Sequence, residues 1–302
     1  MKFGIAIPSY RIDGDTAFMT VAAQAADDLG YHSIWFADHL AIPDDYLDYL
    51  GPEWFEPIIT ASYLAAKTKR VKVGWDVIIV PYRNPVILAK MIATLDVMCQ
   101  GRVIFAGAGG YVPGEFAGLG LDFAKRGEMT DEYLRVLKEI WTAEDPKFSG
   151  KYFNFDGIKA SPKPLQKPHP PVWIGGNAPP AIRRAALMGD GWHPLYPPVE
   201  EMKRGIAEIK RLRGKRGLDG YTISYSGSHV LLDGLLDGVE LPERMRGSGF
   251  QGSPERIAAR FNELAEVGVQ HAMIRFPHQF LGRDQFMRQL ERFIKDVVPL
   301  VK

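Results

Sequence analysis

The chain has 302 residues, of which 46% are hydrophobic and 24% charged, and its formal net charge is +1. This balance is typical of a globular protein and gives no general attraction to nucleic acid. The apolar runs fall far short of the roughly 20 residues of a membrane-spanning helix, and the N-terminus has no signal-peptide pattern. A single cysteine, Cys99, cannot form an internal disulfide, so we expect a cytoplasmic protein.

Strand and helix patterns alternate along the chain. Short apolar and β-branched runs predict eight strands, over residues 3–7, 33–37, 71–80, 103–108, 172–174, 191–193, 221–232 and 270–276. Amphipathic segments that open at proline, serine or acidic residues predict the helices that follow them, over residues 16–29, 57–67, 85–100, 130–142, 181–188, 198–213, 254–267 and 284–298.

Eight strand–helix units predict one domain over residues 1–302, an α/β fold of the (β/α)8 TIM-barrel type. A doubly wound open sheet is the rival, but it carries its glycine motif after the first strand, where this chain has none. Insertions interrupt the alternation after strands 4 and 7, at residues 143–170 and 233–252. The first contains a turn between two short strands, and the second is either a lid over the site or a segment without function.

A small polar segment follows the strand at residues 172–174 and precedes a helix. It consists of Gly175, Gly176, Asn177 and Ala178. Glycine lets the backbone approach a ligand closely, and a helix start offers N–H groups and a partial positive charge. The segment therefore predicts a phosphate site. Arg183, in the next helix, is either a contact to the ligand's tail or a surface residue.

Polar residues also stand at other strand ends, which line the active site of a barrel. Asp38 and His39 follow the second strand, where a histidine can transfer protons, although such pairs also cap loops. Asp76 interrupts the apolar third strand, which indicates a ligand-facing bulge or a salt bridge. Tyr111 follows a glycine-rich strand end that either clears space for a flat ligand or makes a tight turn. His193 and Arg275 end two further strands, as pocket residues or loop anchors.

Several motifs occur in one characteristic order. They are Asp38-His39, residues 81–85 with 88–90 and 93–96, Gly101-Arg102, Glu115-Phe116, Arg126-Gly127, residues 171–176 and residues 190–192. As a set they resemble the bacterial luciferase-like flavin and deazaflavin oxidoreductases over nearly the whole chain. The branch that the chain most resembles uses the deazaflavin coenzyme F-420 rather than FMN.

The resemblance implies a TIM barrel, often dimeric, with the cofactor ring at the carboxyl ends of the strands. It implies that the phosphate is held by Gly175, Gly176, Asn177 and Ala178. Asp76 and Val77 fall where the family has a bulge, often with a cis peptide, that supports the ring. His39 falls near the reactive carbon of the ring. We group Asp38 and Arg183 with the cofactor-binding residues.

Two positions depart from the family pattern. Tyr111 stands where the sugar-phosphate dehydrogenases of the family carry a glutamate acid, which argues against glucose 6-phosphate as the substrate. Tyr111 is then a candidate proton donor, although an ordinary phenol is a weak acid at neutral pH. Trp75 and Asp76 replace the small residues usual at the bulge.

The sequence thus predicts an enzyme that transfers a hydride between coenzyme F-420 and a small, mostly apolar organic substrate, with His39 and Tyr111 as catalytic residues and no metal. The alternatives are an FMN-dependent luciferase-like monooxygenase and a barrel that binds the cofactor without turnover. We expect a cytoplasmic homodimer that binds neither nucleic acid nor membrane. Trp54, Tyr82, Tyr111 and Trp192 indicate a mostly apolar pocket.

Overall fold

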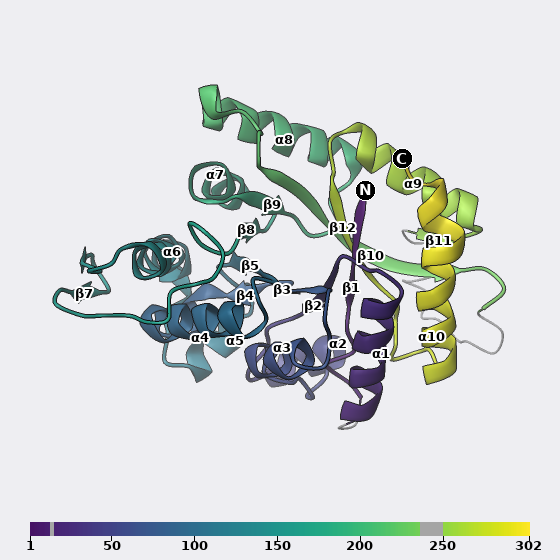
Figure 1. Cartoon of the computed structure of the whole chain (residues 1–302), viewed down its shortest axis with the longest axis horizontal. Coiled ribbons are helices and arrows are strands. Elements are labelled where there is room, and N and C mark those ends of the chain that lie inside the picture. The colour runs from purple at the N-terminus through teal and green to yellow at the C-terminus, as the bar shows by residue number, and fades with distance from the viewer. Residues whose placement is uncertain (13–14, 236–249) are drawn as a thin grey trace.

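The computed structural model describes residues 1–12, 15–235 and 250–302. A closed barrel of parallel strands forms its centre and confirms the predicted fold (Figure 1). Within the described residues the barrel strands are β1 (Lys2–Ala6), β2 (Ser33–Phe36), β3 (Lys72–Trp75), β5 (Val103–Ala108), β8 (Val172–Gly175), β9 (Gly191–His193), β10 (Thr222–Leu232) and β12 (His271–Arg275). The barrel closes because β10 pairs with both β9 and β12, and β12 pairs with β1.

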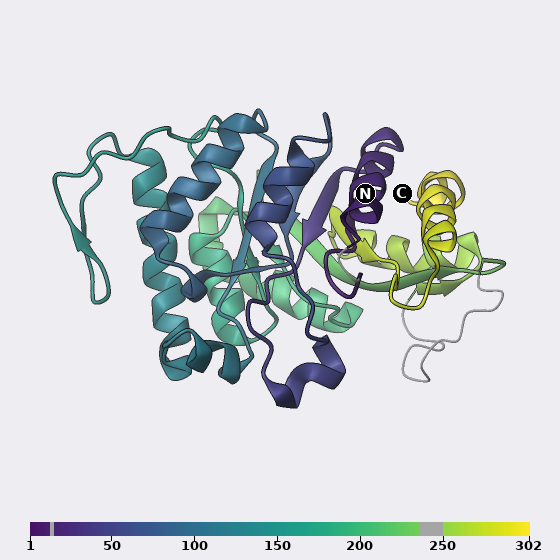
Figure 2. The ribbon, with the colours of Figure 1, turned by 90° about the horizontal axis from the view of Figure 1, so that it is seen from below.

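Helices cover the outside of the barrel (Figures 1 and 2). They are α1 (Thr16–Asp28), α3 (Pro57–Ala65), α4 (Pro85–Met98), α6 (Arg126–Thr142), α7 (Pro179–Met188), α8 (Val199–Arg213), α9 (Pro254–Glu266) and α10 (Arg283–Arg292). Local sequence sets where they begin: Ser253 caps α9 through the N–H of Arg256, and Pro254 occupies its first position. In the described part of the chain no helix has the length and apolar character that crossing a membrane requires.

The third predicted strand, over residues 71–80, is wrong as one continuous element. β3 ends at Trp75, the peptide bond between Asp76 and Val77 is cis, and β4 (Ile78–Ile79) then pairs with β5. Asp76 therefore lies at the carboxyl end of a strand, facing the site, instead of within an apolar run. The pattern also missed two short helices, α2 (Leu47–Leu50) and α5 (Pro113–Gly118), which lie in the loops after β2 and β5.

The two insertions differ in outcome. The first contains the antiparallel hairpin of β6 (Phe148–Ser149) and β7 (Asn154–Phe155), as predicted. The second lies mostly outside the described residues, so its role as a lid stays a prediction; its end forms β11 (Phe250–Gly252), which extends the sheet beside β10. The last helix ends at Arg292 instead of 298. A π-helical segment (Phe293–Val297) and then a 3-10 turn (Val298–Leu300) follow. Pro299 in the 3-10 turn supplies no N–H for a longer α-helix.

Two tryptophans fill the interior of the barrel. Trp35 and Trp173 are buried, and their rings are 5.5 Å apart. Glycines make room for them: a Cβ on Gly74 would lie 2.8 Å from the ring of Trp35, and one on Gly191 would lie 2.6 Å from the ring of Trp173. Side chains therefore fill the centre of the barrel, and the space for a ligand lies at its two ends.

Candidate active site

A cavity of about 470 Å³ opens at the carboxyl ends of the barrel strands. Its walls come from the ends of β1, β2, β3 and β12 and from the loops beside them. Of the predicted site residues, His39, Asp76, Tyr111 and Arg275 line it, whereas His193 does not. Tyr10 and Trp54 add an aromatic wall, with their rings stacked 4.2 Å apart.

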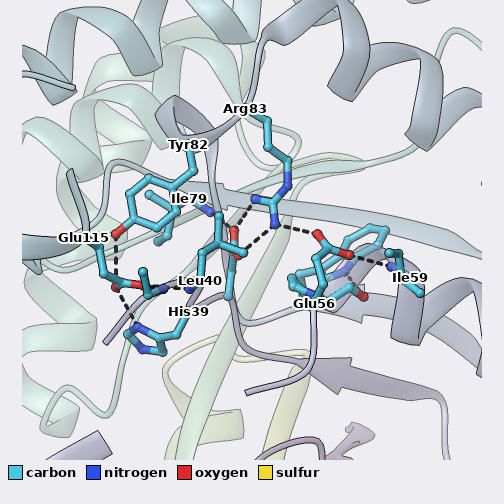
Figure 3. A network of polar contacts seen from close by, with 12 residues as sticks. His39, Leu40, Glu56, Ile59, Ile79, Tyr82, Arg83 and Glu115 are labelled. Carbon is cyan, nitrogen blue, oxygen red and sulfur yellow. Dashed lines mark hydrogen bonds and ion pairs between the residues drawn. The ribbon is translucent and has the colours of Figure 1, made fainter. Parts of the chain in front are cut away.

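His39 is held by a carboxylate from a distant part of the chain. Its Nδ1 atom lies 2.8 Å from Oε2 of Glu115, which also accepts a hydrogen bond from the hydroxyl of Tyr82 (Figure 3). Oε1 of Glu115 accepts from the backbone N–H groups of Leu40 and Ala41. Burial opposes the charged form, but these hydrogen bonds lower the pKa of Glu115 below its ordinary value. An ionised Glu115 only accepts, so Nδ1 of His39 carries a hydrogen and Nε2 is left for a ligand.

Asp38 stands beside His39 but does not belong to the cavity lining. Both of its oxygens accept hydrogen bonds from Arg83, at 2.6 and 2.9 Å, and one also accepts from the N–H of Ile79. Arg83 also bonds Glu56, whose other oxygen caps α3 (Figure 3). Asp38 thereby fixes the backbone that carries His39, while its direct contact with a cofactor stays a prediction.

Asp76 is buried and paired on both sides. Its Oδ1 atom lies 2.9 Å from Nε2 of His193, and its Oδ2 atom forms an ion pair with Arg275. Burial favours the protonated form, but Arg275 and His193 bring the pKa of Asp76 down to about 2. The two interpretations of Asp76 are therefore compatible, because the carboxylate forms a salt bridge and still lines the cavity.

The predicted phosphate segment joins β8 to α7. Gly176 has a φ of +108°, which favours glycine, and a Cβ on Gly175 would lie 2.7 Å from Cγ1 of Val77. Val77 therefore packs closely against this segment. Pro179 and Pro180 occupy the first positions of α7 and have no N–H, so this helix offers fewer donors than an ordinary helix start. An anion would have to bind the amides that precede α7.

The cavity lining does not include Val77, Gly175, Gly176, Asn177, Ala178 or Arg183. The side-chain amide of Asn177 forms two hydrogen bonds, both 2.8 Å, with the backbone of Leu195, and Leu195 does line it. Arg183 is exposed on α7, whereas its neighbour Arg184 is buried and bonded to Asp131. Asn177 thus joins the phosphate segment to the cavity rim, and a contact between Arg183 and the cofactor stays a prediction.

Tyr111 lies at the rim of the cavity and is 53% exposed. Its ring meets the ring of His39 edge-on at 6.0 Å, and the ring of Trp54 lies 4.5 Å from His39 on another side. Partial burial and neighbouring tyrosines raise the pKa of Tyr111, which makes its phenol a still poorer proton donor at neutral pH. Proton transfer by Tyr111 stays a prediction that these surroundings do not favour.

Sequence reasoning gave no role to Glu115, although it noted the residue within a motif. Glu115 lies on the short helix α5, and it contacts a histidine 76 positions earlier in the chain. No local pattern reports such a contact. Of the aromatic residues expected in the pocket, Trp54 and Tyr111 line it, whereas Tyr82 bonds Glu115 and Trp192 is buried with its ring N–H on Gly176.

Comparisons with known proteins identify the family. The family model described as luciferase-like monooxygenase matches residues 1–233. An uncharacterised protein of Mycobacterium tuberculosis is 30% identical over 241 residues, which cover 75% of this chain and 81% of that protein. The FMNH2-dependent dimethylsulfone monooxygenase of Pseudomonas putida is 25% identical over 297 residues, which cover 82% of this chain and 78% of that enzyme.

Solved structures share the fold over the whole chain. The monooxygenase RslO1 from Streptomyces bottropensis matches with a TM-score of 0.83 at 19% identity, over 99% of both chains. An F-420-dependent secondary alcohol dehydrogenase in complex with an F-420–acetone adduct matches with a TM-score of 0.80 at 19% identity, over 100% of this chain and 99% of that one. At such identities the structures establish the fold, and the family model establishes the relationship. The chain therefore belongs to the luciferase-like monooxygenase family of flavin and deazaflavin oxidoreductases.

Proposed function

We propose that this protein transfers a hydride between coenzyme F-420 and a small, mostly apolar organic substrate held in the cavity. The observation that carries the proposal is the His39–Glu115 pair at the cavity wall. Hydride transfer to or from a carbonyl, enone or imine needs a partner that gives or takes a proton. His39 offers Nε2 for that purpose, and Glu115 stabilises the ring when it becomes charged.

The residues around the cavity fit a flat ring with a phosphate-bearing tail. Gly175 and Gly176 keep the segment after β8 free of side chains, and Asn177 holds it against the cavity rim through Leu195. When bound, the deazaflavin supplies the carbon that gives or accepts the hydride. The chain supplies the rest: Trp54 and Tyr10 wall off water, and the Glu115 carboxylate keeps the His39 ring in one orientation.

FMN-dependent monooxygenation is the second candidate function. The observation that favours it is the relative from Pseudomonas putida, whose name states that it depends on FMNH2. The same phosphate segment and the same aromatic wall would serve FMN, since both cofactors carry a tricyclic ring and a phosphate. Geometry alone gives no preference, so the cofactor has to be identified by binding.

Titration of the purified protein tests the cofactor. We would follow fluorescence with coenzyme F-420, with FMN, and with reduced FMN in the absence of oxygen. We expect F-420 to bind at least tenfold more tightly, a difference of about 1.4 kcal/mol in binding free energy. A tenfold preference for either form of FMN would overturn the assignment and favour the monooxygenase.

Turnover separates an enzyme from a barrel that only binds. The F-420 complex would be tested in both directions with a panel of alcohols, enones and imines, following the absorbance of the oxidised cofactor. We expect one class to react. A tight complex that reacts with none of the panel would support binding without turnover. The homodimer and the cytoplasmic location remain predictions, which sedimentation and cell fractionation would check.

A further inference from the structure

A row of buried polar side chains leads from the cavity into the barrel. Asp76 begins it, with Oδ1 2.9 Å from Nε2 of His193. Nδ1 of His193 lies 2.8 Å from the hydroxyl of Ser224, and that hydroxyl lies 2.9 Å from Nδ1 of His271. These side chains come from four different strand regions, so the closed barrel is what brings them into one line.

The row continues to the opposite end of the barrel. Nε2 of His271 lies 2.9 Å from the hydroxyl of Ser33, which lies 3.2 Å from Nδ1 of His32. His32 lines a second cavity, of about 650 Å³, formed at the amino ends of the strands together with Lys2 and Lys72. Burial and these two lysines lower the pKa of His32 to about 4, so its ring is neutral at neutral pH. Six side chains thus connect two cavities.

Aromatic rings keep the middle of the row dry. Trp35 stacks on His193, with ring centroids 4.9 Å apart, and Trp173 meets His271 edge-on at 5.1 Å. His193, His271, Ser33 and Ser224 are each at most 1% exposed. Burying polar groups costs free energy unless they are hydrogen-bonded, and barrel interiors are usually filled with branched apolar residues. The retention of four such groups in one connected line calls for a function.

Donor and acceptor chemistry orders the half of the row next to the active site. Asp76 is ionised and can only accept, so it takes the hydrogen on Nε2 of His193. With the hydrogen on Nε2 used in that bond, Nδ1 of His193 is the acceptor for the hydroxyl of Ser224. With its own hydrogen used in that bond, Ser224 accepts from Nδ1–H of His271.

The same order continues through the other half. Burial and neighbouring cationic groups lower the pKa of His271 well below its ordinary value, so this ring is neutral and accepts at Nε2 from the hydroxyl of Ser33. The oxygen of Ser33 accepts from Nδ1–H of His32 and from the ring N–H of Trp35, at 2.8 Å. Every group in the row therefore donates one hydrogen toward Asp76.

We propose that this row is a proton relay between Asp76 in the active site and the solvent at the amino end of the barrel. A proton that binds Nε2 of His32 lets Nδ1 pass its hydrogen to Ser33. One hydrogen then shifts at each link until Oδ1 of Asp76 is protonated. Only N–H and O–H bonds change, and the charge that enters at His32 ends by neutralising the carboxylate. A passage in the opposite direction restores the first order.

The use of the relay in catalysis rests on the proposed function. When a ring and a substrate cover the cavity, the relay would carry a proton between the solvent and Asp76 at the cavity wall, while His39 remains the group that exchanges a proton with the substrate. Oxidation of a substrate would send a proton the other way. The order of hydrogens, by contrast, is a property of the protein without cofactor and can be tested separately.

Long-range ¹H–¹⁵N spectra of histidine-labelled, cofactor-free protein report which ring nitrogen carries the hydrogen. The chain has seven histidines, so assignment by single His→Gln variants is practical. We expect the hydrogen on Nε2 of His193 and on Nδ1 of both His271 and His32. Any other arrangement in the wild-type protein would overturn the relay, and the His→Gln variants serve only to assign its signals.

Coupling along the row is tested by Asp76→Asn. The new amide oxygen must face Arg275, which only donates, so the amide nitrogen donates to His193. We expect the hydrogen to move to Nδ1 of His193 and, two links further on, to Nε2 of His271. An unchanged His271 would show that the histidines are separate structural residues and would overturn the proposal.

Two serine variants complete the test. In Ser224→Ala the row is cut, so adding Asp76→Asn should no longer move the hydrogen on His271. In Ser62→Ala, a matched change on α3 that removes only a bond to the carbonyl of Ile58, the response to Asp76→Asn should persist. A response of His271 that survives in Ser224→Ala would refute transmission through the row. All of these spectra are independent of which cofactor binds.

Discussion

Nδ1 of His39 lies 2.8 Å from Oε2 of Glu115, and the other oxygen of Glu115 binds the backbone of the two residues that follow His39. One carboxylate therefore fixes both the ring and the loop that carries it. Of these groups, the His39 ring is the one that lines the cavity. Substituting His39 and Glu115 one at a time therefore separates the contribution of the ring from that of the carboxylate that holds it.

The variant His39→Ala should lose turnover and keep cofactor binding. A positioned general acid or base contributes on the order of 10²- to 10⁴-fold to rate, so we expect kcat to fall in this range. The cofactor Kd should change less than about threefold, because the phosphate segment lies elsewhere. Steady-state kinetics and fluorescence titration measure the two quantities. Turnover at the wild-type rate would remove His39 from the mechanism.

The variant Glu115→Gln should lower kcat by tenfold or more while the fold persists. It keeps the size of the side chain but removes the negative charge that stabilises a protonated His39. Tyr82→Phe is the matched control, because it removes a single hydrogen bond of 3.1 Å to the same carboxylate oxygen. We expect a much smaller change in kcat for it. Equal effects of the two variants would mean that packing, and not charge, is what Glu115 provides.

Asp76 should make stability depend on acid pH. Its pKa of about 2 lies below the 3.8 of an unperturbed carboxyl group, so the folded state favours the charged form. This contribution, about 2 kcal/mol of unfolding free energy, is present above pH 4 and is lost as the pH falls toward 2. Urea unfolding between pH 5 and 2 should therefore show the stabilities of wild type and Asp76→Asn converging. Parallel curves would contradict the assignment.

The variant Gly176→Ala should weaken cofactor binding more than it weakens the fold. Its φ of +108° is unfavourable for alanine, at a cost of about 1 kcal/mol or more in folding stability. Gly157→Ala is the control, since Gly157 has a φ of +67°, has open space around its Cβ position, and lies in the first insertion, outside the cavity lining. Thermal unfolding should show a loss for both variants, larger for Gly176→Ala because its new Cβ would also lie 3.0 Å from Cβ of Ala181. Only Gly176→Ala should raise the cofactor Kd.

The variant Tyr111→Phe tests the least supported of the catalytic residues. The phenol is half-exposed and its pKa is raised, so we expect kcat to change less than tenfold. Tyr111→Ala should raise KM more than the phenylalanine variant does, because it also removes the ring beside His39. A loss in Tyr111→Phe as large as in His39→Ala would restore Tyr111 as a proton donor.

Much of the fold could be predicted because the pattern that reports it is local. Apolar runs and helix starts such as Ser253-Pro254 give the order of strands and helices, and eight repeats of that order leave few architectures. The break after Trp75 was missed because Ile78 and Ile79 look like a continuation of the same strand. Their pairing with β5 begins only after the chain turns at Asp76.

The site was only partly predictable, because its chemistry depends on contacts between distant segments. Position after a strand was enough to single out His39, and an acidic residue within an apolar run was enough to single out Asp76. Their partners, Glu115 and Arg275, lie 76 and 199 positions further along the chain. Asp38 shows the opposite case, since its neighbour in sequence lines the cavity while its own carboxylate turns to Arg83.

Trp35 on β2 can occupy its position because residue 4 on β1 is a glycine and has no Cβ. A Cβ on Gly4 would lie 2.5 Å from the hydroxyl oxygen of Ser33 and would also meet the ring nitrogen of Trp35. The apolar filling of the barrel and the polar line through it are thus one packing arrangement. A larger residue at Gly4 would alter no charge and no polar side chain. It would nevertheless displace Ser33 and so interrupt the hydrogen-bonded row that connects the two cavities.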